Sequence, residues 1–263
     1  MTNLYFECKS GISGDMSVAA LLDLGASSEK LEKALTSIGL NDEFKYIISK
    51  KPVNSIMTTD FDVIIKEKEV EFCDRKNEHF EHNHEHYHDH AHPHIHRNLD
   101  DVYSIIDKAD TTENAKMLAK KIFKIVAEAE SKVHGKDIKD IHFHEVGAID
   151  SIVDIVSFAV LLDDLNPKKV YFSSLTDGQG FVECQHGTIP VPVPAVCEIT
   201  SAYKLPIKIS DNNGEMVTPT GAAITAALYS GEKLPEEFII EKIGYGAGKR
   251  PYKNPVLRVF SIK

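Results

Sequence analysis

The sequence predicts an α/β fold of mixed sheets packed against helices. Short apolar runs near both ends of the chain, at 4–8 and 256–262, are typical of strands. Between them, longer segments with apolar residues three and four positions apart are typical of helices that cover a sheet. With 263 residues, of which 42% are hydrophobic and 27% charged, the chain can form a sizeable core in one large domain or two small ones.

The expected strands and helices can be placed in order along the chain. Apolar runs and alternation predict strands at 4–8, 44–48, 61–65, 169–173, 180–184 and 256–262. Helical periodicity and glycine stops predict helices at 18–24, 28–38, 100–107, 115–134 and 152–162, with a last helix opened by 215–223. The helix at 152–162 is apolar almost all round, so we expect it at the centre of the molecule.

Local signals mark where several helices begin. Residues 110–113 and 151–154 have the spacing of a capping box, and Asp150 is an alternative N-cap for the second of these helices. Thr218 followed by Pro219 predicts an N-cap and a first helical residue. Three prolines alternate with valines over 190–194. Because proline cannot donate to a strand ladder, this segment is expected to form a rigid, extended wall.

Composition and charge exclude several classes of function. The net charge of −10 argues against a nucleic-acid backbone as the main partner, because phosphate would be repelled. No apolar run approaches the roughly 20 residues that span a bilayer, and the start of the chain lacks the basic and apolar regions of a signal peptide. The cysteines form no C-x-x-C pair, which favours a reducing compartment. A soluble, cytoplasmic protein without a membrane partner is therefore expected.

A change of composition divides the chain into three parts. Residues 1–66 are predicted to form an N-terminal βα segment with a glycine-rich loop, 67–97 a flexible, exposed linker, and 98–263 the main α/β portion. Histidine occupies every second position in one stretch of the linker, at His82, His84, His86, His88, His90, His92, His94 and His96. Neutral imidazole suits Ni, Zn and Cu, so this histidine tract is expected to collect metal. The alternative is repeat drift in a tolerant linker.

The segment 142–154 concentrates metal ligands and general bases. His142 and His144 point the same way if the chain is extended there, and Glu145 follows at once. Asp150 and Asp154, four residues apart, open the next predicted helix. Imidazole and carboxylate groups gathered in one short segment favour a divalent-metal or catalytic site. The alternative is a capped helix preceded by ordinary hydrogen-bonded histidines.

Two other segments are typical of anion sites, because free backbone N–H groups and the helix dipole favour a phosphate at a helix start. The first lies between a predicted strand and a predicted helix and comprises Ser10, Gly11, Ser13, Gly14 and Asp15. The second opens the last helix, with Thr218, Thr220 and Gly221. Residues 244–250 form an apparent glycine loop that ends in two cations. A plain capped turn explains each segment as well. His186, beside a glycine, is a candidate third histidine for the metal set.

Several of these segments occur together, in this order, in one family. They are 10–16, the histidine tract, 142–154, 184–194, 217–223 and 244–248. With them the chain resembles, over essentially its whole length, the LarC-type nickel insertion proteins. The resemblance implies a lyase-class reaction in which Ni(II) is inserted into pyridinium-3,5-bisthiocarboxylic acid mononucleotide, with nickel–sulfur and nickel–carbon bonds formed at the expense of CTP. The product is the nickel-pincer cofactor of lactate racemase-type enzymes, which are the implied acceptors.

The chain departs from the family pattern in two places. Glu7 and Lys9 stand where members usually carry an aspartate and an aromatic residue. Full-length members also continue well past this C-terminus, into a domain linked to CTP and a divalent cation. In some organisms the two parts lie in separate reading frames. The resemblance therefore implies a separate C-terminal subunit as partner, without which the chain is expected to bind nickel but not to complete the reaction.

The hypothesis assigns roles to the candidate residues. His142, His144 and Glu145 hold the nickel ion, and the glycine loop and the start of the last helix hold the substrate phosphate. A base must take the proton that the ring carbon loses, and the candidates for it are Asp150, Asp154 and His186. Two other functions stay open. One is nickel storage or delivery without catalysis, which would depend wholly on the histidine tract. The other is a metal-dependent phosphohydrolase.

Overall fold

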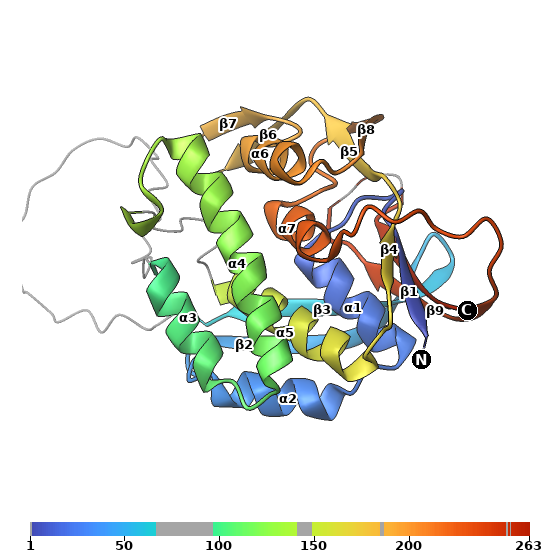
Figure 1. Ribbon diagram of the computed structural model, residues 1–263, viewed down its shortest axis with the longest axis horizontal. Coiled ribbons are helices and arrows are strands. Elements are labelled where there is room, and N and C mark those ends of the chain that lie inside the picture. Colours follow the sequence, from blue (N-terminus) through green and yellow to red (C-terminus); the bar gives the residue numbers. More distant parts are fainter. Residues whose placement is uncertain (1, 67–96, 141–148, 185–186, 251, 253) are drawn as a thin grey trace, which may run out of the picture.

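The computed structural model describes residues 2–66, 97–140, 149–184, 187–250, 252 and 254–263 (Figure 1). Several predictions fall outside these ranges. They concern the histidine tract and nearly all of the linker, and the candidate ligands His142, His144, Glu145 and His186.

One mixed sheet of six strands forms the base of the molecule, in the order β2-β3-β9-β10-β1-β4. The strands are β1 (Asn3–Glu7), β2 (Phe44–Val53), β3 (Ile56–Ile65), β4 (Val170–Phe172), β9 (Ile240–Ala247) and β10 (Val256–Ile262). β1 pairs antiparallel with β10 and parallel with β4, and β2 and β3 form an antiparallel hairpin. Strands that precede and follow the predicted linker therefore lie in the same sheet. The pairing of β1 with β10 also brings the two ends of the chain together (Figure 1).

Helices cover one face of this sheet in two layers. The helices are α1 (Gly14–Leu24), α2 (Ser28–Ser37), α3 (Leu99–Lys108), α4 (Glu113–His134), α5 (Ile149–Leu165), α6 (Pro194–Tyr203) and α7 (Pro219–Leu228). α1 contacts β3, β9 and β10, and α4 packs on α5, α6 and α7 (Figure 1). Phe6 on β1 meets Phe158 on α5 edge-on, with ring centroids 6.2 Å apart. The α/β class and the central position of α5, whose apolar side chains are buried on all sides, are confirmed.

Two small sheets and a short turn complete the described part of the chain. β5 (Leu175–Gln179) pairs parallel with β8 (Ile207–Asn213), and β6 (Phe181–Cys184) pairs antiparallel with β7 (Gly187–Pro190). A 3₁₀ turn, η1, spans Ile138–Asp140. No helix in the described ranges is long and apolar enough to cross a membrane.

Several local predictions are wrong, each for a physical reason. Thr112, not Asp110, caps α4, because its side chain accepts a hydrogen bond from the Ala115 N–H at 3.1 Å. α5 already begins at Ile149, so Ser151 lies inside the helix and does not open a capping box. The proline wall ends early, because Pro194 is the first residue of α6 and proline suits that position.

The predicted glycine loop at 244–250 is also wrong in its first half, which is strand β9. The glycines there serve close packing. A Cβ on Gly244 would lie 2.1 Å from the Ala20 oxygen, and one on Gly246 would lie 2.0 Å from the Met16 oxygen. Because α1 runs directly over β9, these two positions admit no side chain. The turn proper follows β9 and carries the two cations, Lys249 and Arg250.

Candidate functional site

The N-termini of three helices meet at one cavity of about 320 Å³. From α1 and its cap come Ser13, Gly14, Asp15 and Met16; from α5 come Asp150, Ser151 and Asp154; from α7 and the segment before it come Glu215, Met216, Thr218, Pro219 and Thr220. Val63 and the turn after β9, with Gly248, Lys249, Arg250 and Tyr252, complete the lining. Helix N-termini carry unpaired N–H groups and the positive end of the helix dipole, so this convergence favours an anion.

Backbone contacts fix the glycine loop against the start of α7. The Ile12 N–H donates to the Met216 oxygen at 3.0 Å, and the Thr218 N–H donates to the Ile12 oxygen at 3.1 Å. Glycine is required on both sides of this contact. A Cβ on Gly11, where φ is +81°, would lie 2.0 Å from the Met216 oxygen, and one on Gly221 would lie 2.1 Å from the Ile12 oxygen. The loop and the helix start therefore form one rigid unit.

A buried carboxylate, that of Asp177, anchors the segment just before α7 through backbone hydrogen bonds. Asp177 is fully buried, and its Oδ1 accepts hydrogen bonds from the N–H groups of Gly178 (2.8 Å), Met216 (2.8 Å) and Val217 (3.1 Å). Its Oδ2 is buried with no hydrogen-bond partner in the described part of the chain. Burial raises the pKa of Asp177, and the three backbone hydrogen bonds only partly oppose this. Asp177 thus positions the residues next to Glu215 and Thr218 in the cavity wall.

Two carboxyl groups on the first turns of α5 have raised pKa values. Burial, followed by the charges of Asp15 and Asp150, raises the pKa of Asp154 well above its usual range. Burial also raises the pKa of Asp150, although the Ser151 N–H donates to its Oδ1 at 2.8 Å. The Asp154 side chain is partly exposed to the cavity, but its Oδ1 is buried and lacks a hydrogen-bond partner within the described ranges.

Gly14 allows Asp154 to lie against the start of α1. A Cβ at Gly14 would be 2.5 Å from the Asp154 Oδ2, and the backbone of Asp15 makes a hydrogen bond to the Asp154 carboxyl group. Ser13, the N-cap residue, donates its hydroxyl to Asp15 Oδ1 and does not cap the helix with its own side chain. The acid from α5 therefore takes up part of the hydrogen-bonding capacity at the α1 N-terminus.

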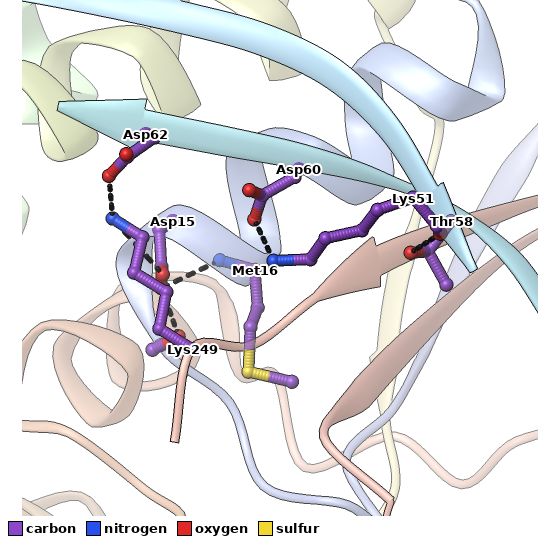
Figure 2. A network of polar contacts seen from close by, with 8 residues as sticks. Asp15, Met16, Lys51, Thr58, Asp60, Asp62 and Lys249 are labelled. Atoms are coloured by element: carbon purple, nitrogen blue, oxygen red, sulfur yellow. Dashed lines mark hydrogen bonds and ion pairs between the residues drawn. The ribbon is translucent and has the colours of Figure 1, made fainter. Parts of the chain in front are cut away.

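Two cations border the cavity, each beside an acid. Lys249 Nζ lies 2.5 Å from Asp62 Oδ1 on β3 and 4.0 Å from Asp15 Oδ2. Figure 2 shows these three side chains close together. Burial lowers the pKa of Lys249, but these carboxylates outweigh it, so the net shift is upward. Arg250 Nη2 lies 2.5 Å from the buried Glu215 Oε2. Both side chains stay about half exposed, so an entering anion can reach them.

Tyr252 closes the same side of the cavity. Its hydroxyl donates to the Ser10 oxygen at 2.9 Å, which joins the turn after β9 to the glycine loop. Burial, with the charge of Asp15 as the next cause, raises the pKa of Tyr252 above its usual range. The phenol therefore stays protonated and serves as a hydrogen-bond donor.

The structure brings most of the described site candidates together. Those that line the cavity are Ser13, Gly14, Asp15, Asp150, Asp154, Thr218 and Thr220. Three others, Ser10, Gly11 and Gly221, shape the cavity through backbone contacts. No three histidine, cysteine or acidic side chains within the described ranges lie close enough together to hold a metal ion.

Sequence reasoning missed several residues of the site, among them Glu215, which lines the cavity and pairs with Arg250. Met16 and Tyr252 line the cavity, and Asp62 pairs with Lys249. Asp177 accepts a hydrogen bond from the Met216 N–H and so supports the cavity wall. No local pattern marks the two aspartates, because each acts through residues far away in the sequence. Tyr252, two residues after Arg250, would have been found by extending the cationic segment.

Comparison with known proteins identifies the family to which the chain belongs. The model of the nickel insertion protein family matches residues 4–262. The chain is 46% identical over 261 residues to a pyridinium-3,5-bisthiocarboxylic acid mononucleotide nickel insertion protein of Alkaliphilus metalliredigens, and 48% identical over 250 residues to the protein of that name from Acetivibrio thermocellus. These alignments cover 99% and 95% of this chain but 60% and 57% of the relatives, so the chain spans about 60% of their length. No solved structure matches the chain. The chain belongs to the nickel insertion protein family.

Proposed function

We propose that this chain binds pyridinium-3,5-bisthiocarboxylic acid mononucleotide and carries out the nickel-insertion step of nickel-pincer cofactor synthesis. Two relatives that are 46% and 48% identical carry this activity in their names. The observation that carries the proposal is the cavity where the N-termini of α1, α5 and α7 converge beside Lys249 and Arg250. A mononucleotide with two thiocarboxylates is strongly anionic, and such a convergence suits an anion.

The substrate phosphate is assigned to the helix starts. Ser13 and the glycine loop lie on one side, Thr218 and Thr220 on the other, and all of them reach the same cavity. Backbone N–H groups and short hydroxyl side chains are the usual phosphate ligands. Lys249 and Arg250 supply the charge that the neutral hydrogen-bond donors lack. This arrangement leaves the carboxyl groups of α5 for the reacting end of the substrate.

Asp154 is proposed to take the ring proton. A nickel–carbon bond forms only as the ring carbon loses a proton, and a nearby base accepts that proton as the bond forms. Burial and acidic neighbours raise the pKa of Asp154 well above its usual range, and a raised carboxyl pKa is typical of a general base. Asp150, with a smaller upward shift of its pKa, and His186 are the other candidates.

The nickel ligands are proposed to be His142, His144 and Glu145. These residues precede α5, which starts at Ile149 and carries Asp150 into the cavity. Glu145, the last of the proposed ligands, therefore lies nine residues before the proposed base, Asp154. The histidine tract would collect Ni(II) and raise its local concentration.

The remaining components of the reaction are proposed from the family. CTP and its divalent cation would bind mainly in the region by which the relatives exceed this chain. Insertion would occur in the cytoplasm as a lyase-class reaction. The finished cofactor would pass to a lactate racemase-type enzyme.

Reconstitution tests the proposal. Purified chain is mixed with substrate and Ni(II), with and without CTP and the C-terminal region of a relative, and the nickel-containing product is measured by mass spectrometry. We expect product only in the complete mixture. Release of phosphate from simple esters with Mn(II) would instead favour the phosphohydrolase, and nickel binding that is lost entirely with the histidine tract would favour storage.

A further inference from the structure

A second cavity, of about 520 Å³, adjoins the first. The two share Glu215, Pro219 and Arg250 as lining residues. The rest of the second cavity is formed by the C-terminal end of α4, the β6–β7 hairpin and the start of α6. The wall between the cavities is therefore the Glu215–Arg250 ion pair together with Pro219.

The donor atoms of the two cavities differ. Apart from backbone groups, the described lining of the first offers carboxylate, hydroxyl and thioether groups, with no imidazole or thiol. The second offers the imidazole of His134 and the thiol of Cys184, with Glu130 and Glu183 beside them. Imidazole and thiolate are donors that suit Ni(II), whereas carboxylate and hydroxyl oxygens suit Mg²⁺ and Mn²⁺ better. The second cavity is thus the better match for nickel.

The imidazole is already oriented as in many metal sites. His134 Nε2 lies 3.1 Å from Glu130 Oε2, one turn earlier on α4. When Nε2 carries the proton and donates it to this carboxylate, Nδ1 keeps the lone pair that a metal needs. Cys184 stands at the end of β6, partly exposed, with its Sγ 3.4 Å from the Gly187 oxygen. The imidazole of His134, on helix α4, and the thiol of Cys184, on the β6–β7 hairpin, therefore border the same cavity.

The number of protein donors indicates that this cavity binds the ion transiently rather than permanently. Glu130, Glu183 and Glu215 outnumber Arg250, as four acids outnumber two cations in the first cavity, so the imidazole and thiol donors, and not charge alone, favour a divalent cation here. Over the described ranges, however, no three such donors are grouped tightly enough to hold an ion. An ion held by few protein donors keeps water ligands and is released readily, as conduction through a pore also requires.

We propose that the second cavity is the route by which Ni(II) reaches the substrate: Cys184 and His134 bind the ion, and Glu215, which faces both cavities, receives it next. The thiol proton passes to solvent as the nickel–sulfur bond forms, and no oxidation state changes. Arg250, half exposed, can swing away from Glu215 when the ion arrives. The direction of transfer rests on the proposed function of the first cavity.

The test is a Ni(II) titration without nucleotide, followed by thiolate-to-nickel charge-transfer absorption in the near ultraviolet. All proteins carry Cys73→Ser, so that the signal reports only Cys8, Cys184 and Cys197. We expect the band in this background and in Cys197→Ser, whose thiol on α6 lines neither cavity. We expect its loss in Cys184→Ser. Glu130→Gln should weaken nickel affinity by about tenfold, the usual effect of removing a carboxylate that orients a metal-binding histidine.

The outcomes separate this site from the nickel-insertion reaction. An unchanged band in Cys184→Ser, or no band in the Cys73→Ser background, overturns the proposal. Asp154→Asn should keep the band while losing insertion. If no protein inserts nickel but the band follows Cys184, the metal site stands and the function proposed for the first cavity fails. Circular dichroism melting curves confirm that each variant is folded.

Discussion

The two cavities share a wall but differ in the charge that they are suited to hold. The first is surrounded by helix N-termini and bordered by Lys249 and Arg250, which favour an anion. The described lining of the second includes the starts of α6 and α7 at its edge, but it combines a thiol and an imidazole with carboxylates, which favour a cation. The Glu215–Arg250 pair between them presents one charge of each sign.

This difference suggests how a metal can be kept from an anionic substrate until both are in place. Free Ni(II) would bind thiocarboxylates in any geometry, whereas an ion delivered through one wall meets a substrate already oriented by its phosphate. Glu215 is buried and its neighbour Met216 is held by Asp177, so the wall is rigid on one side. Variants that affect one cavity and spare the other test this division.

The largest effect is expected from Asp154→Asn, which concerns only the first cavity. Loss of the proposed base should slow insertion by about a hundredfold or more, the usual contribution of general-base catalysis. Single-turnover formation of the nickel product measures it. Asp211→Asn, at an exposed position on β8, is the matched control and should insert at the normal rate. An Asp154→Asn rate within twofold of the control would remove Asp154 from the chemistry.

Asp177→Ala should affect both cavities, because Asp177 supports their common wall. Three backbone N–H groups would lose their acceptor, at a cost of about 1–3 kcal/mol for each buried donor left unpaired. Urea unfolding measures the free energy. Asp177→Asn keeps an acceptor oxygen, so we expect it to retain most of the stability. Equal losses in the two variants would mean that the charge, and not the hydrogen bonding, is what matters.

Gly221→Ala should disturb the first cavity alone. Its Cβ would lie 2.1 Å from the Ile12 oxygen, so the glycine loop must move, at a cost of about 1–3 kcal/mol. Substrate affinity should fall with the stability. Gly39→Ala has only backbone strain at φ +79°, with the Lys108 side chain 3.9 Å away as its nearest contact. It should lose stability without losing affinity, and a parallel loss of affinity would argue against the loop as a binding element.

A smaller effect concerns the pH dependence of stability. Burial raises the folded-state pKa of Asp154 above its unfolded value, so this acid costs stability once pH rises through the unfolded pKa of about 3.9. Asp154→Asn should therefore raise the melting temperature at pH 7, and the gain should shrink as pH falls towards 4. Thermal melts at several pH values measure it. A gain that is constant with pH would contradict the pKa shift.

Local signals in the sequence located several elements correctly. Thr218 caps α7 and Pro219 is its first residue, because side-chain capping and a fixed φ depend only on neighbours in the chain. Gly135 likewise ends α4 in the left-handed conformation. β5, β7 and β8 were not predicted, since glycine, proline or polar residues interrupt their apolar pattern.

The site could be predicted only in part. Asp15 and Asp154 were chosen for their own local motifs, and nothing in either motif indicates that they meet. Their contact depends on α1 and α5 packing with their N-termini side by side, which long-range contacts determine. The same limit applies to Asp62 and Lys249, which are 187 residues apart in the sequence.

Binding of the substrate, measured by calorimetry without nickel or CTP, tests the anion site most directly. The wild-type chain should bind the mononucleotide, and affinity should fall as salt is added, because charge contributes to it. Lys249→Met should weaken binding by about tenfold or more, the value of one hydrogen bond to a charged group. Lys45→Met, an exposed lysine on β2 that does not line the cavity, should bind normally. Equal affinity in the two variants would contradict the assignment of the substrate to the cavity where the three helix N-termini meet.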